Sequence, residues 1–284
     1  MYLERFTFPD AEQEFDFFLE IKRKCYDSFY PFQVLGDKEL GTLNFELITV
    51  LYGGNGSGKT TALNVIAERL GLERATLYNR TIFFEDYINL CDYQLKDYVT
   101  NVSRIITSDD VFDFMLNLRT INNGISVKRE DLFEEYLDAK YANFQLKSLD
   151  DYEKLKKVNL ARSKTQSKFV RKSLMGDVRE QSNGESAFMY FADKIKDNGL
   201  YLLDEPENSL SPERQQELLK FLEESARFFG CQFIIATHSP FLLSIKGAKI
   251  YDLDSRPVVA KKWTELANVK TYYEFFKRYE KEFE

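Results

Sequence analysis

Three short runs of mainly apolar residues stand out along the chain and predict buried β-strands. They are FELITVLY at 45–52, Leu200–Leu203 and Phe233–Ala236. Runs of this length with few polar positions are typical of parallel strands that helices cover on both faces. A different motif follows each run, and ligands bind at the carboxyl ends of parallel strands. We therefore expect the residues of these three motifs to meet at one edge of a sheet.

Two helices are predicted next to these motifs. In TTALNVIAERLG the apolar residues recur at helical spacing, at Leu63, Ile66, Ala67 and Leu70. Gly71 comes directly after them and is typical of a helix stop. Further along, Ser211 and Pro212 have the character of a helix N-cap and a first helical residue, before PERQQELLKFLEESARFF.

The stretch GGNGSGKTT fits the pattern G-x-x-x-x-G-K-[ST] between a predicted strand and a predicted helix. Glycines let several backbone N–H groups converge on phosphate oxygens. Lys59 would contact the β- and γ-phosphates, and the Thr60 hydroxyl would ligate Mg²⁺. A glycine-rich turn with a chance Lys-Thr is the alternative, which the flanking elements disfavour. The predicted ATP-binding residues are Gly53, Gly54, Asn55, Gly56, Ser57, Gly58, Lys59, Thr60 and Thr61.

The other two motifs supply groups for hydrolysis. Asp204 follows the second strand and can hold Mg²⁺, and Glu205 can deprotonate the attacking water. His238, the single histidine, follows the third strand, and its neutral imidazole can hydrogen-bond the γ-phosphate. The acids could instead solvate a loop, and a single histidine is more often a packed or surface residue. Position favours function, so Glu205, His238 and Lys59 are the predicted catalytic residues.

Composition limits the class of protein. The 284 residues are 44% hydrophobic and 30% charged, and three cysteines, Cys25, Cys91 and Cys231, imply neither a disulfide framework nor a metal cluster. A membrane span is not expected, and neither is a secretory signal, so the cytoplasm is the expected compartment. A net charge of -7 argues against a nucleic-acid-binding surface overall but permits a local basic patch.

Together these residues resemble the ATP-binding cassette (ABC) superfamily, and more closely its soluble SMC- and RecF-like branch, including short-insert AAA-type ATPases of bacterial defence. GGNGSGKT resembles its Walker A motif, LYLLDE its Walker B motif, NSLSP its D-loop and ATHSP its switch-histidine segment. The resemblance is close over 29–60 and 175–255. It implies an α/β P-loop NTPase, an ABC-type head with a mixed or parallel sheet and an inserted helical lobe.

QSNGES falls where that family carries its signature motif. The resemblance implies a homodimer in which two ATPs lie between two heads. Ser182 and the backbone of Asn183 and Gly184 would then contact the γ-phosphate bound by the other head, with Glu185 next in the motif. Asn183 and Glu185 depart from the common L-S-G-G-Q form. By itself S-N-G-E is a plain turn.

The predicted organisation is one ATPase domain over 1–284, with a mainly helical lobe at 85–180 and a C-terminal helix at 265–284. Two helices are expected in the lobe. The first starts with Ser108 as its N-cap, and the second has Phe133, Leu137, Tyr141 and Phe144 on one face. Gln94 is a candidate glutamine-loop residue, and Tyr30 a candidate for stacking on adenine.

The ends of the chain predict two more helices. An acidic helix at 9–26 is expected to pack Phe15, Phe18 and Ile21 inward. The C-terminal helix carries four aromatic residues, Tyr272, Phe275, Phe276 and Tyr279, and either packs on the core or docks a partner.

Nine basic residues gather at 154–179: Lys154, Lys156, Lys157, Arg162, Lys164, Lys168, Arg171, Lys172 and Arg179. They either contact DNA or an acidic partner, or form an ordinary solvated face.

Three functions remain open. The first is an ATP-hydrolysing head that dimerises around ATP in DNA-related or antiviral processes. The second is a slow ATP-gated scaffold that controls a toxin or nuclease effector. The third, a transporter ATPase subunit, fits the divergent signature and the basic stretch poorly.

Overall fold

The computed structural model describes residues 1–21, 25–141, 152–163, 165, 168, 170 and 183–283. The chain divides into two compact units. The first unit comprises Met1–Phe112 and Asn183–Glu284, and the second comprises Asp113–Ser182. Every strand assigned in the described residues belongs to the first unit.

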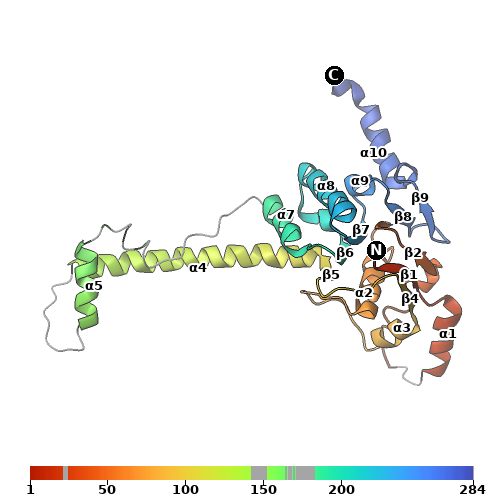
Figure 1. The fold of residues 1–284 in the computed structure, drawn as a ribbon, viewed down its shortest axis with the longest axis horizontal. Coiled ribbons are helices and arrows are strands. Elements are labelled where there is room, and N and C mark those ends of the chain that lie inside the picture. Colours follow the sequence, from red (N-terminus) through yellow and green to blue (C-terminus); the bar gives the residue numbers. More distant parts are fainter. Residues whose placement is uncertain are drawn as a thin grey trace. The chain divides into compact units, whose positions relative to one another are not determined.

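The main sheet of the first unit has six strands in the order β5-β6-β7-β3-β8-β9 (Figure 1). Neighbouring strands are parallel except for the antiparallel pair β8–β9, so the sheet is mixed, as predicted. The strands are β5 Arg104–Thr107, β6 Leu200–Asp204, β7 Gln232–Thr237, β3 Ile48–Tyr52, β8 Lys249–Asp252 and β9 Val259–Lys261.

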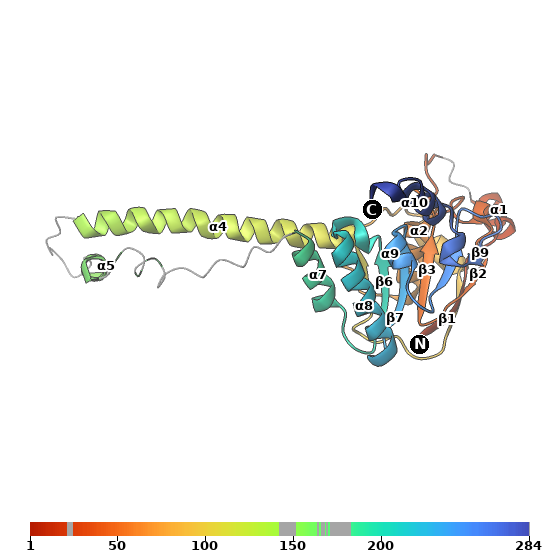
Figure 2. The same ribbon diagram turned by 90° about the horizontal axis from the view of Figure 1, so that it is seen from above.

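The three predicted apolar runs form three adjacent inner strands, β6, β7 and β3. Every residue of β3, β6 and β7 is buried, because helices cover both faces of the sheet. Helix α2, Lys59–Leu70, packs on one side, and helix α8, Pro212–Phe228, lies on the other (Figures 1 and 2). In register, Asp204 pairs with Ala236, and Tyr52 pairs with Thr237. The carboxyl ends of these strands therefore lie side by side.

The predicted boundaries of both helices are confirmed. The Ser211 side chain accepts a hydrogen bond from the Arg214 N–H, and Pro212 is the first helical residue of α8. Helix α2 ends at Gly71, whose φ of 65° is readily adopted only by glycine.

A second, antiparallel sheet has the order β2-β1-β4 (Thr42–Asn44, Leu3–Thr7 and Asp92–Leu95). One buried side chain joins it to the main sheet. Gln232, at the start of β7, accepts hydrogen bonds from the N–H groups of Tyr2 and Leu3 at 2.7 and 2.9 Å. Its amide donates to the carbonyls of Leu3 and Glu46 at 2.7 and 3.1 Å. All the hydrogen-bonding capacity of this amide is thus used between backbone groups.

The N-terminal helix, α1, spans Ala11–Glu20 and differs from prediction in its inward face. Phe18 and Ile21 pack on the core as expected, but Phe15 is 60% exposed. Phe17 takes the inward place and stacks on Phe32 with ring centroids 4.3 Å apart. Glu14 is also buried and accepts from the Gln33 N–H. The helix therefore turns a different face inward than apolar spacing suggested.

The second unit contains helices in its described residues, and they are distributed differently from the two that the sequence predicted. Helix α4 runs without a break over Ser108–Tyr141, where the sequence predicted two helices, and α5 follows at Tyr152–Ser163. The unit begins at Asp113 rather than at 85, because residues 85–112 supply β4 and β5 to the sheets of the first unit.

Two details of α4 also differ from prediction. Its first turn is capped by Thr107 and Asp110, whose side chains accept from each other's backbone N–H, rather than by Ser108. Tyr136 is the buried residue of the later turns, whereas Leu137 and Tyr141 are 44% and 76% exposed. Phe144 lies outside the described residues. The reciprocal cap is favoured over a cap by Ser108 because it provides hydrogen-bond acceptors for two backbone N–H groups.

Five further elements complete the helical structure that the site uses: α3 Phe84–Leu90, α7 Asn183–Lys194, the short helical turn η3 Pro206–Ser209, α9 Pro240–Leu243 and α10 Ala267–Arg278. Another helical turn, η5 Glu280–Glu282, follows α10, so the predicted C-terminal helix is shorter than 265–284. Across the part of the chain that the structure describes, no helix is both long and apolar enough to cross a membrane.

Gln232→Leu tests the link between the sheets. The substitution leaves two N–H groups and two carbonyls without this partner, so we expect a loss of about 2–4 kcal/mol in the free energy of unfolding. Urea unfolding measures it. Gln216→Leu, at an exposed position on α8, is the matched control and should change stability by less than about 0.5 kcal/mol. Equal effects of the two substitutions on the free energy of unfolding would show that the hydrogen bonds of Gln232 do not stabilise the fold.

Candidate functional site

The glycine-rich loop joins β3 to α2, and Lys59 lies folded across it. The Lys59 ammonium donates to the carbonyls of Gly53 and Gly54 at 2.8 and 3.0 Å. It also lies 3.6 Å from a carboxylate oxygen of Glu205. The residue is only 5% exposed. A buried cation with anionic and carbonyl partners is suited to exchange them for phosphate oxygens.

Two glycines of the loop are required by space or by backbone conformation. Gly58 has a φ of 94°, and a Cβ there would lie 2.9 Å from a methyl group of Leu35. A Cβ on Gly53 would lie 2.4 Å from the Ser57 hydroxyl. That hydroxyl is buried and has no hydrogen-bond partner among the described residues. The loop thus holds a buried hydroxyl group that no described protein atom pairs.

Thr60 and Asp204 meet at the neighbouring edge of the loop. The Thr60 hydroxyl donates to the Asp204 carboxylate at 3.1 Å. Burial raises the pKa of Asp204 to about 6, although the hydrogen bond from Thr60 opposes the shift. A hydroxyl and one carboxylate are oxygen ligands of the kind that Mg²⁺ takes together with water and phosphate. The two residues therefore fit the predicted metal role.

Glu205 and His238 come from adjacent strand ends and face each other. Nδ1 of His238 lies 3.7 Å from the Glu205 oxygen that also faces Lys59. The other oxygen of Glu205 accepts from the Asn208 amide at 3.0 Å. Glu205 has a φ of 47°, a left-handed conformation that is costly for any residue but glycine. Lys59, Glu205 and His238 are thus brought together as the three strands predicted.

A second glutamate, Glu207, belongs to the same cluster and was not predicted. It is buried in η3, and one of its oxygens accepts from the Thr237 hydroxyl at 2.6 Å. The same oxygen accepts from the N–H groups of His238 and Ser239. The letters DEPEN contain a signal for Glu207, an acid shortly after the strand, but such an acid also suits a solvated loop.

A pocket opens beside Asp204 and Thr60. Tyr30 is one of its walls, and its hydroxyl donates to the Thr61 hydroxyl at 3.1 Å. Arg74 is another, with its guanidinium 4.1 Å from the Tyr78 ring centroid. The pocket is lined by Tyr30, Thr60, Asn64, Arg74, Leu77, Tyr78, Asn79, Thr107, Ser108, Asp109 and Asp204. Tyr30 is therefore next to the phosphate loop, and its contact with adenine stays a prediction.

Gln94 lies elsewhere. It is an exposed residue of β4 in the antiparallel sheet, where it pairs with Arg5. Sequence distance from the phosphate loop suggested Gln94, but the pocket beside Asp204 takes Thr107–Asp109 from the end of β5 instead.

The predicted signature residues stand at the start of α7. Ser182 lies outside the described residues, and Asn183 and Gly184 open the helix. Glu185 accepts from Arg214 of α8 at 3.0 Å, and Gly184 faces the same side chain. This helix start is therefore attached to the segment that follows the acidic pair.

The basic stretch at 154–179 is described only in part. The side chains of Lys156, Arg162 and Lys168 are exposed. Those of Lys154 and Lys157 are not described, and Lys164, Arg171, Lys172 and Arg179 lie outside the described residues.

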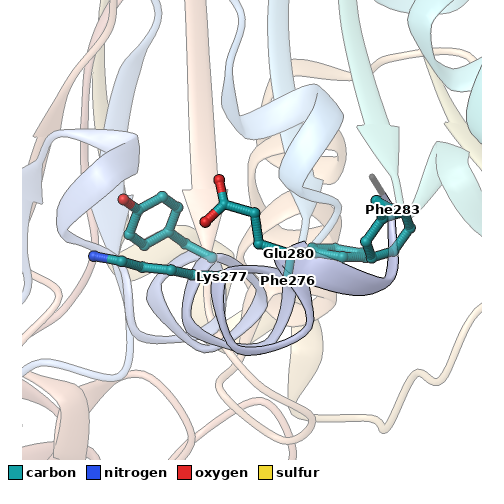
Figure 3. A pocket seen from close by; sticks show the side chains of 5 residues that line it. Phe276, Lys277, Glu280 and Phe283 are labelled. Carbon is teal, nitrogen blue, oxygen red and sulfur yellow. The ribbon is translucent and has the colours of Figure 1, made fainter.

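The C-terminal helix, α10, both packs on the core and exposes aromatic residues. Leu266, before its first turn, and Val269 are buried, whereas the four predicted aromatics Tyr272, Phe275, Phe276 and Tyr279 are 38–53% exposed. Phe276, Lys277, Glu280 and Phe283 line a shallow pocket with Tyr273 (Figure 3). The Asn268 amide donates to the carbonyl of His238 at 2.7 Å. The start of this helix thus touches the site.

The strand order, with the glycine-rich loop between β3 and α2, defines an α/β P-loop fold. Residues 92–244, more than half of the chain, match the family described as "AAA domain, putative AbiEii toxin, Type IV TA system". The chain belongs to this family. The match contains both acidic residues and His238, whereas the phosphate loop precedes it. Among curated proteins there is no match.

Solved structures that match this chain include two Smc head domains. The Pyrococcus furiosus head, bound to a domain of ScpA, is 15% identical, with 84% of this chain and 96% of that chain covered and a TM-score of 0.41. The Thermotoga maritima head is 13% identical, with 92% of this chain and 99% of that chain covered and a TM-score of 0.38. A dimeric bacterial ABC transporter cassette is 16% identical, with 79% of this chain and 90% of that chain covered and a TM-score of 0.37. These similarities are distant, and no functional conclusion rests on them.

The raised pKa of Asp204 predicts a pH dependence of stability. The folded chain holds this proton up to about pH 6, whereas an unfolded aspartate releases it near 3.8. Between these values the folded state binds more protons, so the site's contribution to the free energy of unfolding falls as pH rises. Asp204→Asn has no carboxyl group to ionise at this position, so it should not lose this part of the free energy of unfolding as pH rises. Relative to the parent, it should gain about 2–3 kcal/mol between pH 4 and pH 7.

Urea unfolding at both pH values, in EDTA and without nucleotide, measures this gain. Asp109→Asn is the control, because it removes an exposed carboxylate from the same pocket. A stability difference between Asp204→Asn and the parent that is the same at both pH values would contradict the burial argument.

Proposed function

We propose that the protein binds and hydrolyses ATP with Mg²⁺, using one site at the carboxyl ends of β3, β6 and β7. The observation that supports this most strongly is the cluster itself. Lys59, Glu205 and His238 lie in the segments that follow three separate strands, and both Lys59 and His238 lie within 3.7 Å of one Glu205 oxygen. Such a cluster serves no evident packing purpose, since it places two ionisable side chains beside a buried ammonium group.

Each residue has a role that its surroundings support. Lys59 binds the terminal phosphates by exchanging its loop carbonyls for phosphate oxygens. Glu205 accepts the proton of the attacking water. Thr60 and Asp204 would hold Mg²⁺, which neutralises phosphate charge when bound. The buried Ser57 hydroxyl, which lacks a protein partner in the described structure, would donate to phosphate.

We further propose that two copies of the chain close around two ATPs. The start of α7 supports this, because the N–H groups at a helix start bind anions, and Asn183 and Gly184 are the first residues of this helix. The attachment of Glu185 to Arg214 joins this helix start to the segment that follows Glu205. Ser182 and the N–H groups of Asn183 and Gly184 would contact the γ-phosphate held by the other copy.

The process that this cycle serves is proposed to be DNA-related or antiviral defence in the cytoplasm. The family description, with its reference to a toxin and a toxin–antitoxin system, supports a defence role. The exposed Lys156, Arg162 and Lys168 support DNA contact. Stimulation of ATP hydrolysis by DNA would favour this function over the next one.

The alternative is an ATP-gated scaffold with slow turnover that holds a toxin or nuclease. Its supporting observation is α10, which exposes aromatic residues and is hydrogen-bonded to His238 through Asn268. Tight ATP-dependent capture of a partner, with turnover that DNA does not change, would favour it.

Two substitutions separate binding from hydrolysis. Lys59→Ala removes the cation of the phosphate loop and should abolish ATP binding. Glu205→Gln keeps the shape of the side chain but removes the base, so it should bind ATP at parent affinity and lose about 10²-fold or more of the hydrolysis rate. Fluorescent-nucleotide titration and phosphate release measure the two quantities. Hydrolysis at the parent rate by Glu205→Gln would refute its role as the base.

The solution mass of Glu205→Gln tests the dimer. Light scattering behind a sizing column, with and without Mg²⁺-ATP, should show the mass doubling from that of a 33.4 kDa chain. Ser182→Arg in the same background should prevent the doubling, because it places bulk and charge in the shared site. Lys59→Ala is the control that lacks nucleotide. A monomer under all conditions would contradict the homodimer.

A further inference from the structure

Glu207 joins the segment after β6 to the segment after β7. A single oxygen, Oε1, accepts three hydrogen bonds: from the Thr237 hydroxyl at 2.6 Å, from the His238 N–H at 3.1 Å and from the Ser239 N–H at 3.2 Å. The residue is 7% exposed. A buried carboxylate with several donors is fixed in place, since moving it would leave those donors unpaired.

The backbone of His238 is held from the opposite side as well. Its carbonyl accepts from the Asn268 amide at 2.7 Å, while its N–H donates to Glu207. Next to it, the Ser239 hydroxyl donates to Gln215 at 2.6 Å. The peptide units around His238 are therefore fixed, and only the imidazole, 47% exposed, remains to be oriented.

Two carboxylates face one nitrogen of that imidazole. Nδ1 lies 3.5 Å from Oε1 of Glu207 and 3.7 Å from Oε1 of Glu205. Both groups accept hydrogen bonds and neither donates when ionised. The hydrogen-bond partner of one ring nitrogen decides which nitrogen of a neutral histidine carries the proton.

We propose that Glu207 is a positioning residue that keeps His238 as the Nδ1–H tautomer. In this form Nδ1 carries the proton toward the carboxylates, and Nε2, on the other edge of the ring, is an acceptor. The neutral ring is then suited to accept from the attacking water and cannot donate to a bare phosphate oxygen from Nε2. The sequence predicted only a hydrogen bond between a neutral imidazole and the γ-phosphate, without naming the ring nitrogen or the direction of the bond.

The catalytic part of this inference rests on the proposed function, whereas the tautomer does not. His238 is the only histidine of the chain, so one labelled residue gives an unambiguous signal. The protein is made with ¹⁵N-histidine, without a polyhistidine tag, and studied free of nucleotide in EDTA at alkaline pH. Two-bond ¹H–¹⁵N correlations distinguish the two neutral tautomers.

The parent should show a protonated Nδ1 and a bare Nε2. Glu207→Gln and Glu207→Ala should both lose this preference, with folding checked by circular dichroism. Glu213→Gln, an exposed glutamate of α8, should keep the parent spectrum. An Nε2–H tautomer in the parent, or an unchanged spectrum in both folded Glu207 variants, would overturn the proposal.

Kinetics then test whether Glu207 acts through His238. Glu207→Gln should lower kcat about tenfold or more with ATP affinity unchanged, and should cause no further loss in a His238→Ala background. Additive losses, or a matching loss of ATP affinity, would mean a general structural role and contradict the proposal. If the parent hydrolyses no ATP, the proposed function fails, while the spectrum still decides the tautomer.

Discussion

Parallel pairing of β6, β7 and β3 is the constraint on which the site depends. The three strands are buried along their whole length, so their register is set by packing on both faces and cannot slip without exposing apolar residues. Parallel strands in register end at one edge, and each of these ends is followed by a polar segment. Side chains more than a hundred residues apart in sequence therefore come within hydrogen-bonding distance, as Thr60 and Asp204 do.

The ionisable side chains at this edge lie next to one another, so the charge of each affects its neighbours. Lys59 faces Glu205, Glu205 faces His238, and His238 faces Glu207. Burial makes the charged form of Asp204 unfavourable, which is why its pKa rises to about 6. A site that collects partly compensated charge in this way gains by binding a ligand with both anionic oxygens and a cation. Mg²⁺-ATP has that chemistry.

Most of the architecture could be predicted because the sequence expresses it locally. Apolar runs gave the strands, and the motif at each strand end gave Lys59, Asp204 and His238 their places. The site residue that the sequence did not predict depends on partners that are distant in the chain. Glu207 is informative only once Thr237 and the following N–H groups are seen to converge on it. Its letter by itself suits a solvated loop.

The inserted region also shows that long-range contacts limit what the sequence predicts. Its two predicted helices form one helix, because a reciprocal cap at Thr107 and Asp110 starts it and no strong breaker stops it before Tyr141. Apolar spacing placed Phe133, Leu137 and Tyr141 inward. Phe133 does pack against the cluster around Tyr136, whereas Leu137 and Tyr141 are exposed. Periodicity reports which faces are apolar, whereas the choice of buried face depends on what packs against it.

Hydrogen bonds tie the His238 segment to two other parts of the chain. Glu207 comes from the segment after the proposed base, and Asn268 comes from the C-terminal helix. A change in either part alters the hydrogen bonds of the same peptide units. A backbone group that loses such a partner must find another or stay unpaired, and an unpaired group costs free energy. The His238 segment is thus hydrogen-bonded both to the segment that follows the proposed base and to α10, the helix that exposes aromatic residues.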